Sequence, residues 1–376
     1  MPAITESTAA PSSVAAPSRD ERARSGAERS LALDAYRGLI MIFLISHGFG
    51  LSALKDHPIG KYLAAQVDHV PWEGVVLWDL IQPAFMFMVG VAMPFAFASR
   101  AAKGKGGFWP TFAHVAWRSA VLIFLSQLFV ATGSGPFKFG LINVLSQMAF
   151  TYFLSFLIMQ LEFRLQVGAA AGLLAAHWLL FLQYPGPAGP FSQEGNVGQV
   201  IDQWLLGRNY PGLYVTINFI SSTVTTLFGV WAGMLMRKPI ELREKLRILL
   251  WWAAGCIVGG MLLSLVNPMV KRIWTASFTI YSGGLVILGL AAMLWLVDER
   301  GWKRFAWPMV VVGTNSLFIY CVSQMCRGGI ARAVGTFTGK FEWLGLLGPI
   351  ALDLTVLAVM WSMCYWLYQR KAFVKI

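Results

Sequence analysis

Long apolar runs alternate with short polar segments along most of the chain. Ten of these runs approach the length of about 20 apolar residues that a helix needs to cross a bilayer. The pattern predicts an all-α fold, a polytopic membrane helix bundle of about ten transmembrane helices. The predicted spans are residues 36–54, 75–98, 110–131, 141–160, 165–182, 217–236, 247–266, 273–297, 308–325 and 346–368.

Composition agrees with this reading and excludes one class of protein. Of the 376 residues, 57% are hydrophobic and 13% are charged, which leaves too little polar surface for a water-soluble globular protein. The formal net charge is +12. In a membrane protein such an excess belongs in cytoplasmic loops, so we expect the lipid bilayer as a partner and no nucleic acid.

The distribution of basic residues predicts the orientation of the bundle. An even number of spans places both termini on the same side, and 20 of the 30 Lys and Arg residues fall on that side. Because basic residues concentrate in cytoplasmic loops, both termini are predicted to be cytoplasmic. The loops 55–74 and 183–216 are then outside, and IDQWLLGRN at 201–209 is predicted to form a short interfacial helix.

The chain is predicted to consist of a tail and one domain. Residues 1–30 are rich in Ala, Pro, Ser and charge and contain no apolar block, which is typical of a disordered cytoplasmic tail. Residues 31–376 are predicted to form a single transmembrane domain with an outer loop at 183–216, which is either functional or a plain interfacial tether. The four cysteines lack CxxC spacing and a nearby His, so neither a metal site nor a disulfide is expected.

The densest group of candidate catalytic residues is HVPWEGVVLWDLIQP at 69–83. His69 is predicted at the outer entrance of the second span, and Asp79 about five residues inside it. A histidine above a carboxylate can form an orienting pair, and Pro83 would leave the carbonyl of Asp79 without its helical donor. A neutral imidazole can act as a general base or carry an acyl group. The same spacing also fits an Asp79 that only ties two helices together and a solvated His69.

A second polar cluster is GTNSLFIY at 313–320, in the predicted ninth span. Asn315 and Ser316 can hydrogen-bond across helices, and Gly313 permits close approach of a neighbouring helix. Simple helix-to-helix attachment explains these residues equally well.

Five ordered blocks resemble the heparan-α-glucosaminide N-acetyltransferase family of multispan acyltransferases. They are LDAYRG at 33–38, HVPWEG with Asp79 and Pro83, IDQWLLGRN with GLYVTIN at 212–218, KRIWTASF at 271–278, and GTNSLFIY. The resemblance covers residues 31–325. It implies transfer of an acetyl group from cytosolic acetyl-CoA to an amino sugar or related glycan across the membrane, and it assigns the catalytic histidine to His69.

The hypothesis of an acyltransferase gives roles to other residues. Asp79 would orient His69 and stabilise its cation, and Asn315 and Ser316 would donate to the thioester oxygen. Trp72 would offer a flat face to a sugar ring, with Asp202 and Asn218 as further acceptor contacts, and Arg37 would attract the phosphates of acetyl-CoA. The expected location is a bacterial inner membrane, with a homodimer as a possible assembly.

The rival hypothesis is a sugar or amino-sugar secondary transporter, because ten spans with intramembrane polar groups also suit alternating access. Against it, the two halves of the chain show no Gly- or Pro-broken spans in matching positions. Transport also requires no catalytic histidine.

Overall fold

The computed structural model describes residues 30–131, 139–209 and 214–374. The predicted tail lies outside these residues apart from Ser30, and so do the first two residues of GLYVTIN. The compact unit discussed below is Leu31–Ile376.

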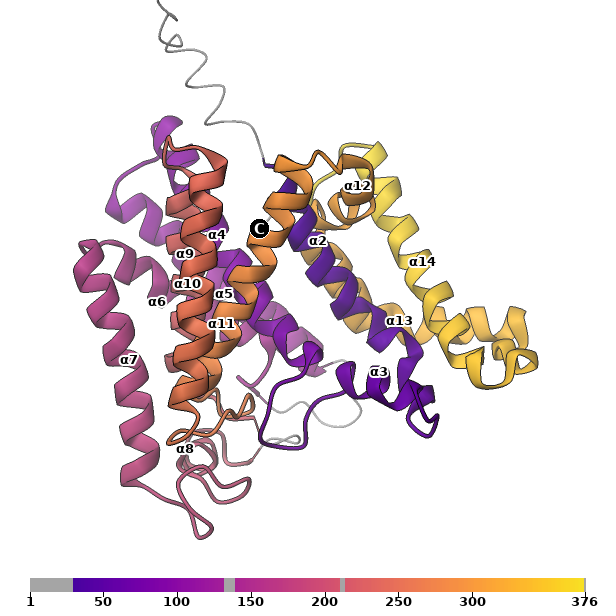
Figure 1. The fold of residues 1–376 in the computed structure, drawn as a ribbon, viewed down its shortest axis with the longest axis horizontal. Coiled ribbons are helices and arrows are strands. Elements are labelled where there is room, and N and C mark those ends of the chain that lie inside the picture. Colours follow the sequence, from indigo (N-terminus) through magenta and orange to yellow (C-terminus); the bar gives the residue numbers. More distant parts are fainter. Residues whose placement is uncertain (1–29, 132–138, 210–213, 375–376) are drawn as a thin grey trace, which may run out of the picture. The chain divides into compact units, whose positions relative to one another are not determined.

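The described part of the chain is helical, as predicted (Figure 1). Its β pairing is limited to two isolated bridges, Glu73 with Val270 and Gly186 with Gly189. The α-helices are α2 Leu31–Ser46, α3 Gly60–Gln66, α4 Ile81–Ala102, α5 Phe108–Ala131, α6 Val144–Met159, α7 Phe163–Gln183, α8 Val197–Leu206, α9 Asn218–Met236, α10 Leu242–Leu263, α11 Ala276–Leu294, α12 Lys303–Gly313, α13 Ser316–Thr338 and α14 Gly348–Gln369. The 3₁₀-helices are η1 His47–Leu54, η2 Leu77–Leu80 and η4 Gly339–Leu347, and η3 Trp295–Glu299 is a π-helical turn.

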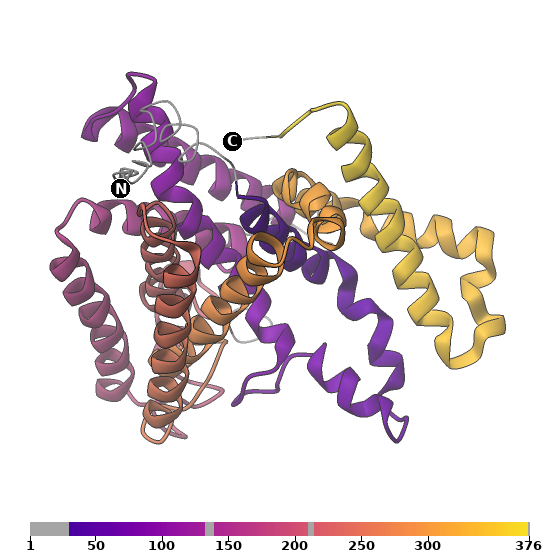
Figure 2. The same cartoon turned by 45° about the horizontal axis from the view of Figure 1, so that its top comes forward.

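Eight segments of the described chain are long and apolar enough to cross a membrane. The last of them, Ser316–Gln369, contains both α13 and α14, which η4 joins into a hairpin drawn in orange and yellow (Figure 2). The helix α6 is apolar but has only 16 residues. The chain is therefore a polytopic helical membrane protein. Eight segments are found where ten spans were predicted, because the last segment holds two long helices, α13 and α14, and because α6 is shorter than 18 residues.

The predicted ninth span, 308–325, is wrong as a single helix. The chain breaks after Gly313, where α12 ends, and α13 begins at Ser316. Gly313 lies so close to α2 that a Cβ added there would overlap the backbone carbonyl of Asp34. The close crossing that glycine permits was therefore predicted correctly, although the helix does not continue past it.

The helices α4 and α9 cross at very short range and form the centre of the main hydrophobic core. A Cβ added at Gly90 would overlap the backbone of Thr226, and one added at Gly229 would overlap the backbone of Phe87. Small residues of this kind let helix backbones approach closely in membranes. The crossing fixes the position of the start of α4, just after Asp79, relative to the start of α9 at Asn218.

The helix predicted around residues 201–209 is present as α8, Val197–Leu206. Asn196 caps it by accepting a hydrogen bond from the backbone N–H of Gln199, as Asn commonly does at this position. Gly207 ends the helix in the left-handed conformation that glycine adopts most readily. The loop predicted at 183–216 is thus partly helical.

Candidate functional site

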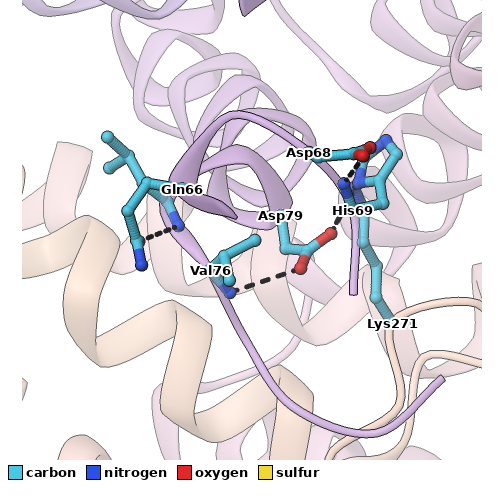
Figure 3. Close-up of polar contacts among 7 residues, drawn as sticks. Gln66, Asp68, His69, Val76, Asp79 and Lys271 are labelled. Carbon is cyan, nitrogen blue, oxygen red and sulfur yellow. Dashed lines mark hydrogen bonds and ion pairs between the residues drawn. The ribbon is translucent and has the colours of Figure 1, made fainter. Parts of the chain in front are cut away.

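His69 and Asp79 meet at the start of α4. Nδ1 of His69 lies 2.7 Å from Oδ1 of Asp79, whose side chain is 1% exposed. Oδ2 of the same carboxylate accepts the backbone N–H of Val76 at 3.3 Å, which caps the short turn η2. Figure 3 shows Asp79 between Val76 and His69. Both carboxylate oxygens are therefore anchored, and the imidazole is held by a fixed partner.

The structure corrects the predicted location of Asp79 relative to the helix. Asp79 lies in the 3₁₀-helix η2, which leads directly into α4, and not inside the α-helix itself. Pro83 is then the third residue of α4, where a helical N–H has no partner within the helix anyway. The predicted effect of Pro83 on the Asp79 carbonyl stays a prediction. The pairing of the two side chains comes from the tight turn.

A third charged side chain, Lys271, joins the pair and was missed from the sequence. Its Nζ lies 3.3 Å from Oδ1 of Asp79 and 3.3 Å from Nδ1 of His69, and its side chain is 5% exposed. Burial lowers the pKa of Lys271 to about 8, although the Asp79 carboxylate acts in the opposite direction. The sequence signal was the KRIWTASF block, which begins two residues before Ile273 and contains Lys271 as its first residue.

Backbone contacts bring the Lys271 loop to the site. The N–H of Gly74, a residue with φ of 118°, donates to the carbonyl of Met269 at 2.9 Å. Glu73 forms a bridge with Val270, which is completely buried. The segment between α10 and α11 is therefore fixed against the segment between α3 and η2.

The contacts determine which imidazole nitrogen is available for chemistry. An ionised carboxylate only accepts hydrogen bonds, so the 2.7 Å contact with Asp79 assigns the proton of neutral His69 to Nδ1. Lys271 then donates to Asp79, since a protonated Nδ1 cannot accept. Nε2 keeps its lone pair, and the His69 side chain is 39% exposed. The imidazole is thus oriented as a general base or nucleophile.

His69 and Lys271 both line a cavity of about 350 Å³. Amide side chains supply much of its polar lining, namely Gln82, Asn143, Gln147, Asn218 and Gln324. Nε2 of Gln82 donates to Oε1 of Gln147 at 2.6 Å, and Gln147 donates in turn to Ser222. Tyr214 also lines the cavity. Burial raises the pKa of Tyr214 to about 12, so its hydroxyl stays protonated at neutral pH.

One buried acceptor on a residue of the cavity wall lacks a partner among the described residues, namely Oδ1 of Asn218. The amide of Asn218 is fixed from its other side, because Nδ2 donates to the carbonyl of Arg272 at 2.7 Å. A buried polar atom without a hydrogen bond is costly, so Oδ1 of Asn218 is a candidate partner for an N–H or O–H group of a ligand.

Asp202 supports this wall from behind. Its carboxylate accepts the backbone N–H of Thr216 with both oxygens, at 3.2 and 3.0 Å, and the residue is 1% exposed. Burial raises the pKa of Asp202, which the hydrogen bond from Thr216 partly offsets. Asp202 is not among the described residues that line the cavity, so it acts on the wall through Thr216.

Trp72 also lies outside the described lining of this cavity. Its indole Nε1 donates to the carbonyl of Phe191 at 2.9 Å, and its ring packs on a small core that includes Phe181 and Val197. The contact fastens the His69 segment to the segment between α7 and α8. The predicted stacking of a sugar on Trp72 stays a prediction.

Three further predicted residues are placed elsewhere in the compact unit. Asn315 donates to the carbonyl of Ala372 at 3.1 Å and accepts the N–H of Val374 at 3.0 Å, so its side chain holds the segment after α14. Ser316 begins α13, and Arg37 lies in α2, 3.5 Å from Asp34. None of the three lines the described cavity around His69.

Within the described ranges, no group of three or more His, Cys, Asp or Glu side chains could hold a metal ion. All four cysteines are free thiols.

Comparison with known proteins gives two related proteins and no family profile that matches the chain. The chain is 23% identical to mouse (Mus musculus) heparan-alpha-glucosaminide N-acetyltransferase over 370 residues, covering 80% of this chain and 54% of the relative. It is 24% identical to the human (Homo sapiens) protein of the same name over 360 residues, covering 78% of this chain and 52% of the relative. The chain thus spans about half the length of these curated relatives.

Proposed function

Because the chain is a distant relative of the heparan-alpha-glucosaminide N-acetyltransferases, we propose that it is a membrane-embedded acyltransferase. Its reaction moves an acetyl group from acetyl-CoA to an amino sugar or a related glycan. The observation that carries the proposal is the His69 imidazole, held by Asp79 and exposed in a cavity. An oriented imidazole in a cavity of this size is what acyl transfer to a small acceptor requires.

In the proposed reaction His69 is the general base. The acceptor amine attacks the carbonyl carbon of the thioester, and Nε2 of His69 takes the proton that the amine loses. As the C–N bond forms, the C–S bond breaks, and the proton passes from Nε2 to the departing thiolate. Asp79 keeps the proton on Nδ1 and stabilises the imidazolium that forms in between.

Lys271 is proposed to stabilise the negative charge that develops on the thioester oxygen. Its ammonium carries two hydrogens besides the one directed at Asp79, and the residue lines the cavity. A fixed donor in a water-poor site is an effective partner for such an oxyanion. We assign this role to Lys271 in preference to Asn315, whose amide already binds Ala372 and Val374.

The acceptor is proposed to bind against the wall formed by Thr216 and Asn218. The unpartnered Oδ1 of Asn218 would accept a hydrogen bond from an amine or hydroxyl group. The amides of Gln82 and Gln324 also line the cavity and can both donate and accept, which suits a substrate rich in hydroxyl groups. A cavity of about 350 Å³ has room for a small acceptor such as a single sugar unit.

The sidedness of the reaction is also a proposal. Acetyl-CoA would approach from the cytoplasm, where Arg37 attracts its phosphates, and the acceptor would lie on the periplasmic side of a bacterial inner membrane. The uneven distribution of Lys and Arg supports this orientation. A matching test is to supply acetyl-CoA on one side only of sealed, oriented vesicles.

The test of function is acetyl transfer from labelled acetyl-CoA to a panel of glucosamine derivatives in proteoliposomes. Wild type is compared with His69→Gln and with the control His57→Asn, in which Asn can still accept the N–H of Gly60 that His57 accepts at 3.0 Å. We expect transfer by wild type and the control but not by His69→Gln. No transfer by wild type, together with uptake of free sugar that survives His69→Gln, would overturn the proposal in favour of a transporter.

Kinetics distinguish direct transfer from an acetyl-histidine intermediate. With direct transfer, acceptor and donor must bind together, and no acetylated protein accumulates without acceptor. With His69 as the nucleophile, label appears on the protein before acceptor is added. Rapid gel filtration at neutral pH, which measures the label retained by the protein before acceptor is added, separates the two routes.

A further inference from the structure

A second hollow lies away from the His69 site, at the start of α10. It has a volume of about 620 Å³ and is bounded by the first turns of α10 and by η3, which follows α11. We call it the α10 groove. Arg243, Arg247, Leu250, Trp251, Trp295 and Glu299 contribute to its walls.

The charged end of the α10 groove has an excess of positive charge. Nε of Arg243 donates to Oε1 of Glu299 at 2.8 Å, which leaves the other guanidinium hydrogens of Arg243 for a further acceptor. Arg247, one turn along α10, is exposed and makes no hydrogen bond or ion pair with the described residues. Arg300 adds another cation nearby, 4.8 Å from the centre of the Trp295 ring.

The other end of the α10 groove is apolar and faces outward. Trp251 is 76% exposed and Leu250 is 48% exposed, and the same helix continues with exposed Val258 and Leu262. On a helix that is long and apolar enough to cross a membrane, exposed side chains of this kind face lipid tails. Trp251 is about 6 Å beyond Arg247 along the helix axis. This distance is similar to the separation between the headgroup phosphate of a lipid and the start of its acyl chains.

The geometry points to an anionic phospholipid as the occupant of the α10 groove. Its phosphate binds Arg243 and Arg247, and its acyl chains lie over Leu250, Trp251 and the lipid-facing side of α10. The order of the side chains carries this inference, because two arginines one turn apart are followed along the same helix by exposed aromatic and aliphatic residues. Basic residues at the membrane surface attract anionic headgroups, and tryptophan favours the interface.

The test is native mass spectrometry of the full chain in detergent, with phosphatidylglycerol or phosphatidylcholine of the same acyl chains as the added lipid. We expect tighter binding of phosphatidylglycerol to wild type. The variant Arg247→Gln should bind it about fivefold more weakly, which is the equivalent of about 1 kcal/mol for one basic residue near the surface. Arg304→Gln is the matched control, since it removes one exposed charge outside the α10 groove and should leave the affinity unchanged.

Two further measurements separate the headgroup from the tails. Arg247→Lys keeps the charge and should retain most of the preference for phosphatidylglycerol, whereas Trp251→Ala should weaken both lipids by a similar factor. Inorganic phosphate alone should not protect the protein from thermal unfolding as the lipid does. Equal affinity for the two lipids in wild type, or an equal loss in Arg304→Gln and Arg247→Gln, would overturn the inference.

Discussion

Asp79 with Lys271 and Asp353 with Arg327 are two ion pairs in or beside candidate membrane spans, but they have different surroundings. Lys271 lies 3.3 Å from Asp79, the side chains are 5% and 1% exposed, and Lys271 lines a cavity with the exposed His69 ring. Nη2 of Arg327 lies 2.6 Å from Oδ1 of Asp353, and the pair joins α13 to α14. Neither Arg327 nor Asp353 lines the described cavity around His69.

The comparison shows why an ionisable residue in a span is only a starting hypothesis for function. Arg327 and Asp353 satisfy each other directly, so their pairing explains their presence in the hairpin. At the Asp79 site, His69 hydrogen-bonds the carboxylate directly, keeps a free nitrogen and lines the cavity. His47 also lies close enough to Arg327 and Asp353 for an electrostatic interaction, but it does not line that cavity. The cavity beside the imidazole, and not the imidazole alone, distinguishes the candidate reactive site from a structural pair.

The largest effect is expected for His69→Gln. Loss of a general acid or base typically costs about 10²- to 10⁴-fold in rate, so acetyl transfer should fall within that range. Folding should be retained because the His69 side chain is 39% exposed. Steady-state transfer assays together with thermal unfolding measure both quantities, and a variant with wild-type rates would remove His69 from the mechanism.

Asp79→Asn should reduce both activity and stability. It leaves Lys271 without its counter-charge, and breaking a buried ion pair commonly costs about 3 to 5 kcal/mol. Adding Lys271→Met should recover much of the stability but no activity, since the oriented imidazole and the ammonium are both absent. Thermal unfolding and transfer assays of the two single variants and the double variant form the test. Recovery of transfer in the double variant would assign the pair a structural role.

The pH dependence of transfer should reveal Lys271. Its folded pKa is about 8, below the ordinary value of 10.5, so the ammonium is lost as pH rises through about 8. We expect transfer to decline above this pH and the decline to move to higher pH in Lys271→Arg, because Arg stays protonated. An unchanged alkaline decline in Lys271→Arg would assign it to another group.

The free energy of unfolding should rise over the pH range in which transfer declines. Between pH 8 and 10.5 the unfolded chain still holds the Lys271 proton that the folded protein has released. The free energy of unfolding contributed by this residue therefore rises with pH in this window. Lys271→Met should remove this rise, which denaturant unfolding at several pH values can measure.

The smallest effect on activity is expected at the other ion pair. Replacing both partners, as Arg327→Met with Asp353→Leu, should leave acetyl transfer within about twofold of wild type, since apolar replacement of a buried pair is often neutral or stabilising. Arg327→Met alone should destabilise the protein by leaving Asp353 without its cation. A large loss of transfer in the stable double variant would erase the functional distinction between the two pairs.

The sequence predicted the features that depend on local pattern. Apolar length identified the helical membrane protein. The ten-residue spacing left a His69–Asp79 pair as one of two alternatives, and the structure has the pair. Lys271 could not be found in this way, because it is 192 residues from Asp79 and reaches it through the backbone bond from Gly74 to Met269. Such a contact depends on how distant loops meet.

The break between α12 and α13 was missed for a related reason. Hydropathy stays high on both sides of Gly313, and the helix ends where α2 crosses it near Asp34. The side-chain partners of Asn315 are likewise distant, since they lie after α14. Both features depend on tertiary contacts, which cannot be predicted from the local sequence pattern.

The separation of Asp79 from Lys271 also has a consequence for biosynthesis. At a synthesis rate of about 5 to 20 residues per second, the ribosome needs roughly 10 to 40 s to add the 192 residues between them. During that interval the nascent chain already contains His69 and Asp79 but not the lysine that completes their charge balance. Assembly of this site therefore waits for insertion of the α10–α11 hairpin, and a nascent chain arrested before residue 271 holds an acidic residue without its cation.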